Sequence, residues 1–294
     1  MNGSAVLYSL IMLMVTLWAS NFIVGKVALQ EFPALLLGSL RIIFAGIFLA
    51  PIYWLKKPSG PPAQQSMWKD WPLLAALAFF NTGNQVAFIA GLSRTSVAHS
   101  ALLIGLSPIL VLLIAAAVKQ EQITAKKILG MGIALAGVGV LVSQAQGRRG
   151  SGATLSGDAL VLLAALGFAA FTVLGKRAAA RHSSLAVNAF AFIGSALALL
   201  PFVWWRFRTF AFEHVTAAGW SSVIYMAVFP SVVCYLIYYY ALTRVPASRV
   251  SAFSYLQPPL AAAMGVLFLG EHITTPLVAG GTVIFTGVVL TERG

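Results

Sequence analysis

The chain has 294 residues, of which 60% are hydrophobic and only 9% are charged, and its mean hydropathy is +0.90. Because a soluble domain carries about 25% charged residues, this composition excludes a soluble globular protein and predicts an integral membrane protein. The net charge of +12 comes from short basic clusters between apolar runs. This pattern is typical of membrane flanks, so we expect the lipid bilayer, and not nucleic acid, as the partner.

Ten apolar runs follow one another along the chain, each bounded by charged residues, proline or polar clusters. About 20 mostly apolar residues cross the hydrocarbon core as a helix, so these runs predict an all-α integral membrane protein with ten transmembrane helices. The lone cysteine, Cys234, lies within the eighth run, which excludes an internal disulfide. The predicted spans are Ala5–Val24, Ala34–Leu55, Leu73–Leu92, Ala98–Val118, Ile128–Ser143, Ala159–Leu174, Leu185–Trp205, Ala217–Leu242, Val250–Leu269 and Pro276–Leu290.

The distribution of Lys and Arg predicts the orientation of the chain. If the N-terminus is cytoplasmic, the loops on that side carry twelve Lys and Arg and the opposite loops carry six, while Arg41 lies within the second span. Short cytoplasmic loops carry the excess of positive charge in membrane proteins. We therefore expect a multi-pass membrane protein with both termini in the cytoplasm.

The second half of the sequence repeats the first at an offset of 150 residues. Pro108 corresponds to Pro258 and Glu121 to Glu271, without an insertion between them. The offset divides the chain into two five-helix repeats, residues 1–147 and residues 151–294. Because five is an odd number, the second copy must enter the membrane from the opposite side. The sequence therefore predicts an inverted repeat, whose substrate site would lie near the midplane where the halves meet.

The fifth and tenth spans contain small residues at three- and four-residue spacing, among them Gly130, Gly137, Gly280 and Gly287. Such spacing lets helices approach closely within a membrane. We interpret these residues as a packing seam between the halves. A phosphate-binding loop is the weaker interpretation, because a glycine run inside an apolar span exposes no helix N-terminus to an anion.

Several short motifs stand out along the chain. They are Trp18-Ala19-Ser20-Asn21-Phe22, Arg41, Leu106-Ser107-Pro108 with its copy Leu256-Gln257-Pro258, and Gly270-Glu271-His272-Ile273-Thr274. In these motifs the chain resembles the EamA-type members of the drug/metabolite transporter superfamily. The resemblance covers essentially the whole chain. It implies ten spans as two five-helix units (5+5) and the export of amino acids or other metabolites, or the carriage of sugars and nucleotide-sugars. Length and aromatic content look most like bacterial exporters of aromatic amino acids, and this resemblance implies a location in a bacterial inner membrane.

Polar side chains inside the spans are candidate substrate-binding residues, because a polar group in hydrocarbon costs free energy unless it is paired. Asn81, Asn84, Gln85 and Phe88 fall on one stripe of the third span at helical spacing. Three amides facing lipid would be costly, so they either line a cavity or bond to neighbouring helices. We expect them to line a cavity.

The eighth span carries Tyr235 and Tyr238 where the first half carries amides. Tyrosine combines an apolar face with a hydroxyl group and so suits an amphipathic ligand. A belt of tyrosines at the membrane interface is the alternative. For His99, near the outer edge of its span, a solvated interface histidine is equally expected. The remaining candidates are Trp18, Asn21, His99, Phe168, Phe171, Ser254, Tyr255 and Gln257.

The sequence contains no nucleotide-binding motif, no set of residues with metal-ligand spacing and no acid–base pair, so we expect no enzyme, catalytic residue, metal or cofactor. All seven acidic residues lie near span ends or in loops, which argues against a carboxylate proton relay at the midplane. We expect a transporter, functional as a monomer, that exports amino acids, aromatic ones included, or similar small amphipathic metabolites by alternating access. A drug or nucleotide-sugar carrier of the same fold is the alternative, and a channel or membrane enzyme is the competing class.

Overall fold

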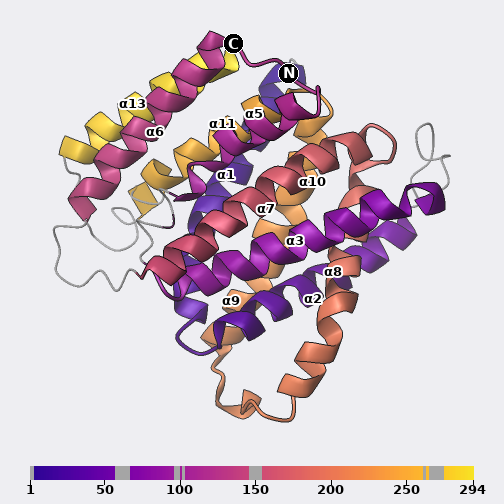
Figure 1. Ribbon diagram of the computed structural model, residues 1–294. Helices are drawn as coiled ribbons and strands as arrows, with labels where there is room; N and C mark the ends of the chain where they lie inside the picture. The colour runs from indigo at the N-terminus through magenta and orange to yellow at the C-terminus, as the bar shows by residue number, and fades with distance from the viewer. Residues whose placement is uncertain are drawn as a thin grey trace.

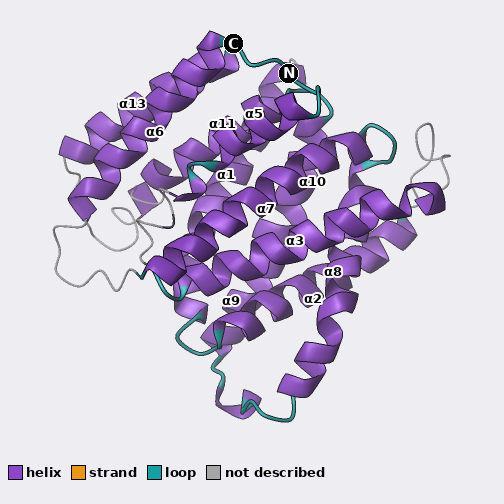
Figure 2. Cartoon of the chain, viewed as in Figure 1, coloured by secondary structure: helices purple, strands orange, loops and turns teal. Residues whose placement is uncertain are grey.

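The computed structural model describes residues 3–56, 67–95, 100, 103–145, 154–260, 263–264 and 275–294. Within these ranges all regular structure is helical and no strand occurs (Figure 2). The helices are α1 (Gly3–Ala28), α2 (Ala34–Leu55), η1 (Met67–Asp70), α3 (Trp71–Leu92), α5 (Ser107–Ala117), α6 (Ala125–Ala145), α7 (Leu155–Ala179), α8 (Ser184–Arg206), η2 (Phe212–His214), α9 (Ala217–Met226), η3 (Ala227–Val233), α10 (Cys234–Leu242), α11 (Ala247–Ala252), η4 (Phe253–Leu256) and α13 (Thr275–Glu292).

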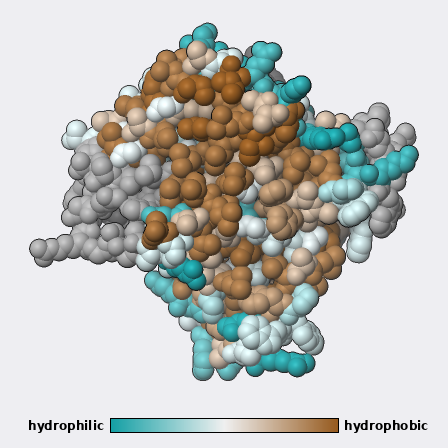
Figure 3. Space-filling view, in the orientation of Figure 1, coloured by the Kyte–Doolittle hydropathy of each residue, from teal (hydrophilic) through white to brown (hydrophobic). Residues whose placement is uncertain are grey.

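Six helices in the described part of the chain are long and apolar enough to cross a membrane. They occupy Ala5–Ala28, Ala34–Leu55, Trp71–Leu92, Leu155–Ala179, Ser184–Arg206 and Ala217–Leu242. The shortest have 22 residues, and at 1.5 Å per residue each reaches about 33 Å, more than the hydrocarbon core. Large apolar side chains such as Phe79, Leu197 and Phe285 are exposed. The face in Figure 3 has a broad apolar area with hydrophilic residues at its edges, as a lipid-facing surface requires.

Polar residues before the helices of the second half explain where those helices begin. Thr154, Ser183 and Thr216 each accept a hydrogen bond on the side-chain oxygen from the backbone N–H three residues later, at 3.1–3.2 Å. A helix leaves its first N–H groups without intrahelical partners, and such caps supply one. These residues start α7, α8 and α9.

Two of the predicted spans are interrupted by a turn or a 3-10 helix, in addition to the eighth, which contains the π-helical segment η3 (Ala227–Val233). The fourth, Ala98–Val118, contains a turn at Gly105 and Leu106 directly before α5. The ninth, Val250–Leu269, changes from α11 to the 3-10 helix η4 before Gln257. Prolines at 108 and 258 follow each irregularity. Proline has no N–H to donate to the carbonyl four residues earlier, and its ring crowds that carbonyl, so each span is interrupted in the turn before its proline.

Helices related by the 150-residue offset pack against each other: α2 against α8, and α6 against α13 (Figure 1). In α6 and α13, Gly130 lies against the backbone of Gly287, and Gly137 lies against that of Gly280. As the residue numbers rise along α6, those of the contacting residues in α13 fall, so the two helices are antiparallel. Gly130 and Gly280 are repeat counterparts, and so are Gly137 and Gly287. The contact of Gly130 with Gly287 is therefore equivalent to that of Gly137 with Gly280, as in a pair of helices related by a two-fold axis. The predicted close packing at these glycines is confirmed.

A second contact also recurs at the offset. The Lys26 ammonium group donates to the carbonyls of Leu92 and Thr95, at 2.6 and 3.0 Å. Lys176 donates to the carbonyl of Val245, the counterpart of Thr95, at 3.3 Å. Each lysine lies in the last turn of the first helix of its half and binds carbonyls at or just beyond the C-terminal end of the third span, where a cation is favourable. Both lysines therefore link helices within their own half.

Candidate functional site

A cavity between the helices contains about 570 Å³ of space that protein atoms do not fill, counting its open mouth. Its lining residues come from both halves of the chain and from seven helices or their flanks. They are Trp18, Asn21, Phe22, Arg41, Asn84, Gln85, Phe88, Ile104, Ser107, Phe168, Tyr235, Ser254 and Gln257.

Eight of these residues form four pairs that the 150-residue offset relates. The pairs are Trp18 with Phe168, Gln85 with Tyr235, Ile104 with Ser254, and Ser107 with Gln257. A space bordered by both members of several such pairs lies where the two halves meet. The last two pairs also flank the interrupted helices. Pro108 and Pro258 have no N–H to donate to the carbonyls of Ile104 and Ser254, and the Ser254 carbonyl accepts from the Gln257 N–H instead.

An aromatic cluster forms one wall. The Trp18 ring meets those of Phe168 and Tyr235 edge to face, each with centroids 5.8 Å apart. Its indole Nε1 donates to the carbonyl of Pro230 at 3.1 Å. Phe22 and Phe88 form another edge-to-face pair at 5.4 Å. These arrangements are favourable for aromatic rings, and they offer a ligand flat apolar surfaces.

A chain of polar side chains forms another wall. The Arg41 Nε donates to the Ser231 hydroxyl at 2.9 Å, and Ser231 lies 3.4 Å from the Gln85 carbonyl oxygen. The Gln85 amide donates to Asn81 at 2.8 Å, and Asn81 donates to Ser195 at 3.1 Å. All five residues are buried. The chain joins helices of both halves and holds Gln85 and Arg41 at the cavity surface.

Ser231 takes its place in this chain from an irregular helix. It lies in η3, a π-helical segment that contains Pro230, and its hydroxyl also donates to the Met226 carbonyl at 2.9 Å. Proline removes one backbone hydrogen bond, and π-helical turns often occur at functional sites. The same segment offers the Pro230 carbonyl to Trp18, so both walls depend on η3.

Nine of the sequence-predicted site residues line the cavity. They are Trp18, Asn21, Asn84, Gln85, Phe88, Phe168, Tyr235, Ser254 and Gln257. Asn84 also donates to the Tyr235 hydroxyl at 3.3 Å. The structure thus brings these nine residues to one cavity, and their role in substrate binding stays a prediction.

The other predicted residues lie elsewhere. Asn81 donates a hydrogen bond to Ser195 of another helix and accepts one from Gln85. This matches the alternative interpretation of the third span, in which its amides bond to neighbouring helices. Phe171 is buried behind Tyr235, and Tyr255 is buried with its hydroxyl unpaired among the described residues. Tyr238 is also buried and shares a hydrogen bond of 2.9 Å with Thr172, so it is part of no exposed belt. His99 and the segment from Gly270 to Thr274 lie outside the described residues.

Four lining residues were missing from the predicted set: Phe22, Arg41, Ile104 and Ser107. The repeat could have found two of them, because Ile104 and Ser107 are the counterparts of Ser254 and Gln257, which were predicted. Arg41 and Phe22 carry no such signal: their counterparts, Ala191 and Thr172, do not line the cavity.

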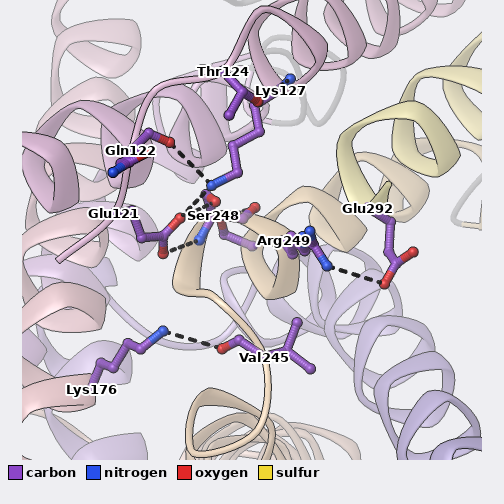
Figure 4. Close-up of polar contacts among 10 residues, drawn as sticks. Glu121, Gln122, Thr124, Lys127, Lys176, Val245, Ser248, Arg249 and Glu292 are labelled. Atoms are coloured by element: carbon purple, nitrogen blue, oxygen red, sulfur yellow. Dashed lines mark hydrogen bonds and ion pairs between the residues drawn. The ribbon is translucent and has the colours of Figure 1, made fainter. Parts of the chain in front are cut away.

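Away from the cavity, Glu121 connects the halves (Figure 4). Its carboxylate forms an ion pair with Lys127 at 3.1 Å and accepts hydrogen bonds from the Ser248 hydroxyl and, at 3.1 Å, the Ser248 N–H. Burial raises the pKa of this carboxyl, but the bonds from Ser248 and Lys127 outweigh it, so the pKa lies below its ordinary value. Glu121 is therefore a charged structural link.

Two further contacts join loops of opposite halves. Asp70 accepts from Arg181 at 2.7 Å and lies 2.9 Å from His182. These bonds outweigh the effect of burial and hold the Asp70 pKa below its ordinary value. Glu31, at the position corresponding to Arg181, accepts from the N–H and hydroxyl of Thr216, both at 2.7 Å. Each contact connects the first loop of one half to the start of a helix in the other.

Membrane-length helices, two related halves and a polar and aromatic cavity between them define a membrane transporter that takes a small molecule. The EamA-like transporter family matches residues 6–143 and 155–293. The chain belongs to this family.

Similar proteins carry transporter names. An "Uncharacterized transporter" of Archaeoglobus fulgidus is 28% identical, covering 96% of each chain. The "Probable terminal-alkyne amino-acid exporter" of Streptantibioticus cattleyicolor is 28% identical over 100% of this chain and 95% of its own. The "Probable amino-acid metabolite efflux pump" of Salmonella typhimurium is 26% identical over 97% and 94%. A solved crystal structure with 18% identity superposes with a TM-score of 0.77 over 98% of this chain and 97% of that one, which shows the shared fold.

Proposed function

We propose that the chain exports amino acids, aromatic ones included, or similar small amphipathic metabolites, and that the cavity is the substrate site. The observation that carries this proposal is the lining of the cavity by four repeat-related pairs. A site that borders equivalent elements of both halves can be opened to either side by movement of one half against the other.

The proposed architecture is ten transmembrane helices in two inverted five-helix repeats. The antiparallel, reciprocal glycine contacts of α6 and α13 support it, because α6 and α13 are the last helices of the two halves. The two chain ends also lie near each other at one end of the molecule (Figure 1), as an even number of crossings requires. The excess of Lys and Arg in the loops on the N-terminal side supports cytoplasmic termini in a bacterial inner membrane.

The chemistry of the lining supports an amphipathic substrate. Trp18, Phe168 and Phe88 provide apolar faces for a side chain, while Asn84, Gln85 and Gln257 provide hydrogen-bonding groups for a polar end. Arg41 is the only basic residue among the described lining residues. A nucleotide-sugar carries two phosphate charges, so the lining suits an amino acid better. The names of two relatives, an exporter and an efflux pump, support export as the direction.

Counterflow in liposomes tests this function directly. Proteoliposomes preloaded with unlabelled phenylalanine, tryptophan, leucine or glycine are diluted into labelled phenylalanine. We expect transient accumulation of label with the amphipathic amino acids and little with glycine, which lacks a side chain for the aromatic wall. Protein-free liposomes are the control. No accumulation with any amino acid, from folded reconstituted protein, would refute the proposed function.

A further inference from the structure

Arg41 is a buried cation at the surface of the cavity. It lies in α2, is 3% exposed and contributes to the cavity lining. Its Nε donates to the Ser231 hydroxyl at 2.9 Å. Among the described residues, no carboxylate pairs with Arg41, and the four N–H groups of its two terminal nitrogens have no hydrogen-bond partner.

A buried cation without an anion is unfavourable, because the charge has lost its water without gaining an opposite charge. The Ser231 hydroxyl supplies only a dipole, and it is already engaged with the Met226 carbonyl. The free side of a guanidinium group is a planar fork whose parallel N–H groups fit the two oxygens of a carboxylate. The unoccupied donors of Arg41 therefore fit a carboxylate on a ligand.

The rest of the described lining contains no matching site for a positively charged amine. None of the described acidic residues, Glu31, Asp70, Glu121, Asp158, Glu213 and Glu292, lines the cavity. An ammonium group would meet neutral acceptors such as the Asn21 carbonyl oxygen, which has no hydrogen-bond partner among the described residues. Near Arg41 the same group would be repelled. The carboxylate of a ligand thus meets a full charge, and its amine meets only dipoles.

We propose that Arg41 binds the carboxylate of the substrate, and that the site accepts monocarboxylates with an apolar or aromatic body whether or not they carry an α-amine. Amines that lack a carboxylate are excluded. The inference rests on the proposed function in one respect, that the cavity is the substrate site. It adds 2-oxo, 2-hydroxy and unsubstituted carboxylic acids to the substrates, and it assigns their recognition to a single residue.

Three ligands that differ only in their charged groups test the inference. The affinities of phenylalanine, 3-phenylpropanoate and phenethylamine are measured on purified protein in nanodiscs, from the fluorescence change of the tryptophans, since Trp18 lines the cavity. We expect phenylalanine and 3-phenylpropanoate to bind within about tenfold of each other. Phenethylamine should bind about 10- to 150-fold more weakly, the effect of losing hydrogen bonds to a charged group.

The variant Arg41→Gln should weaken 3-phenylpropanoate by the same factor and leave phenethylamine unchanged or improved. Arg206→Gln is the matched control, because it removes the same charge from a partly exposed residue outside the cavity, and it should change neither affinity. If Arg41→Gln does not fold, the wild-type order of the three ligands decides. Two results would overturn the inference without contradicting the proposed function. One is that phenethylamine binds as tightly as 3-phenylpropanoate, and the other is that folded Arg41→Gln keeps the wild-type affinity for 3-phenylpropanoate. Wild-type protein that binds none of the three would count against the proposed function itself.

Discussion

Asn84 in α3 donates a hydrogen bond to the hydroxyl of Tyr235 in α10 across 3.3 Å, and both residues border the same cavity. The first belongs to one half of the chain and the second to the other, so the wall of the cavity is itself a contact between the halves. Movement of one half against the other, as alternating access requires, would change this contact. Ligand binding and conformational change would then act on the same residues.

Tyr235 should determine the preference for large substrates. Its ring lies edge to face with Trp18, and its hydroxyl bonds to Asn84. We expect Tyr235→Ala to reduce tryptophan uptake about 2- to 13-fold more than alanine uptake, since an aromatic contact contributes about 0.5–1.5 kcal/mol. Tyr235→Phe keeps the ring and serves as control: the ratio should stay near wild type. Equal losses for both substrates in Tyr235→Ala would show that the ring only supports the fold.

Because α6 and α13 pack closely, substitution of Gly137 by alanine should destabilise the protein, whereas the same substitution at Gly139 should not. A methyl group on Gly137 would overlap Ile284 and the backbone of Gly280, whereas one on Gly139 would meet open space. We expect Gly137→Ala to destabilise the protein by about 1–3 kcal/mol through overpacking. Gly139→Ala should have little effect. Thermal unfolding in one detergent measures both, and equal Tm values would contradict the packing seam.

Glu121 should act in stability and not in turnover. Its side chain is 4% exposed and pairs with Lys127. Glu121→Gln leaves Lys127 as a buried unpaired charge, which costs about 3–5 kcal/mol. The double variant with Lys127→Met removes both charges and should recover much of the Tm. Loss of pH-dependent transport by well-folded Glu121→Gln, with exchange retained, would make Glu121 a coupling residue instead.

The direction of the pKa shift of Glu121 determines the pH range over which its ion pair stabilises the protein. The folded pKa of Glu121 lies below its ordinary value. Its contribution to stability is therefore complete above the unfolded value of about 4.3 and is lost as the pH falls through the folded pKa. Between pH 8 and pH 6, we expect wild-type Tm to show no change that depends on Glu121. The difference in Tm between wild type and Glu121→Gln, measured across this range, should stay constant.

Orientation can be tested with single cysteines. Arg177 and Arg208 are both exposed, and the charge distribution predicts that Arg177 is cytoplasmic and Arg208 is outside. Cys234 is buried and is replaced by alanine in the background. In intact cells an impermeant thiol reagent should label Arg208→Cys and leave Arg177→Cys unmodified until the membrane is permeabilised. The reverse pattern would invert the orientation.

Much of the fold was predictable because apolar length and repeat spacing are properties of the sequence itself. The runs at Ala34–Leu55 and Ala217–Leu242 have the observed bounds. The offset that relates Gln85 to Tyr235 predicted that both border one space. The breaks at Pro108 and Pro258 follow from the missing N–H of proline, although their geometry depends on neighbouring helices.

The site was less predictable, because a helical stripe defines a face and not the neighbour that packs against it. Asn81 and Asn84 share a stripe, yet Asn81 bonds to Ser195 while Asn84 reaches the cavity. Arg41 gave no periodic signal, and its role depends on Ser231, which the π-helical turn η3 positions. Pro230 marks a disturbed turn in the sequence, but the side chain that the π-helical geometry brings to Arg41 depends on how the helices pack.

The affinity of the protein for phenylalanine after removal of two lining amides tests most directly whether the cavity is the substrate site. The double variant Asn84→Ala, Gln85→Ala should weaken binding about 5- to 150-fold or more. The loss of one orienting polar contact, about 1–3 kcal/mol, already has an effect of this size. Asn188→Ala is the matched control, because Asn188 is an equally buried amide that bonds to the Val232 carbonyl at 3.4 Å and does not line the cavity. It should lower Tm and leave the affinity unchanged. Wild-type affinity in the folded double variant would contradict the assignment of the cavity.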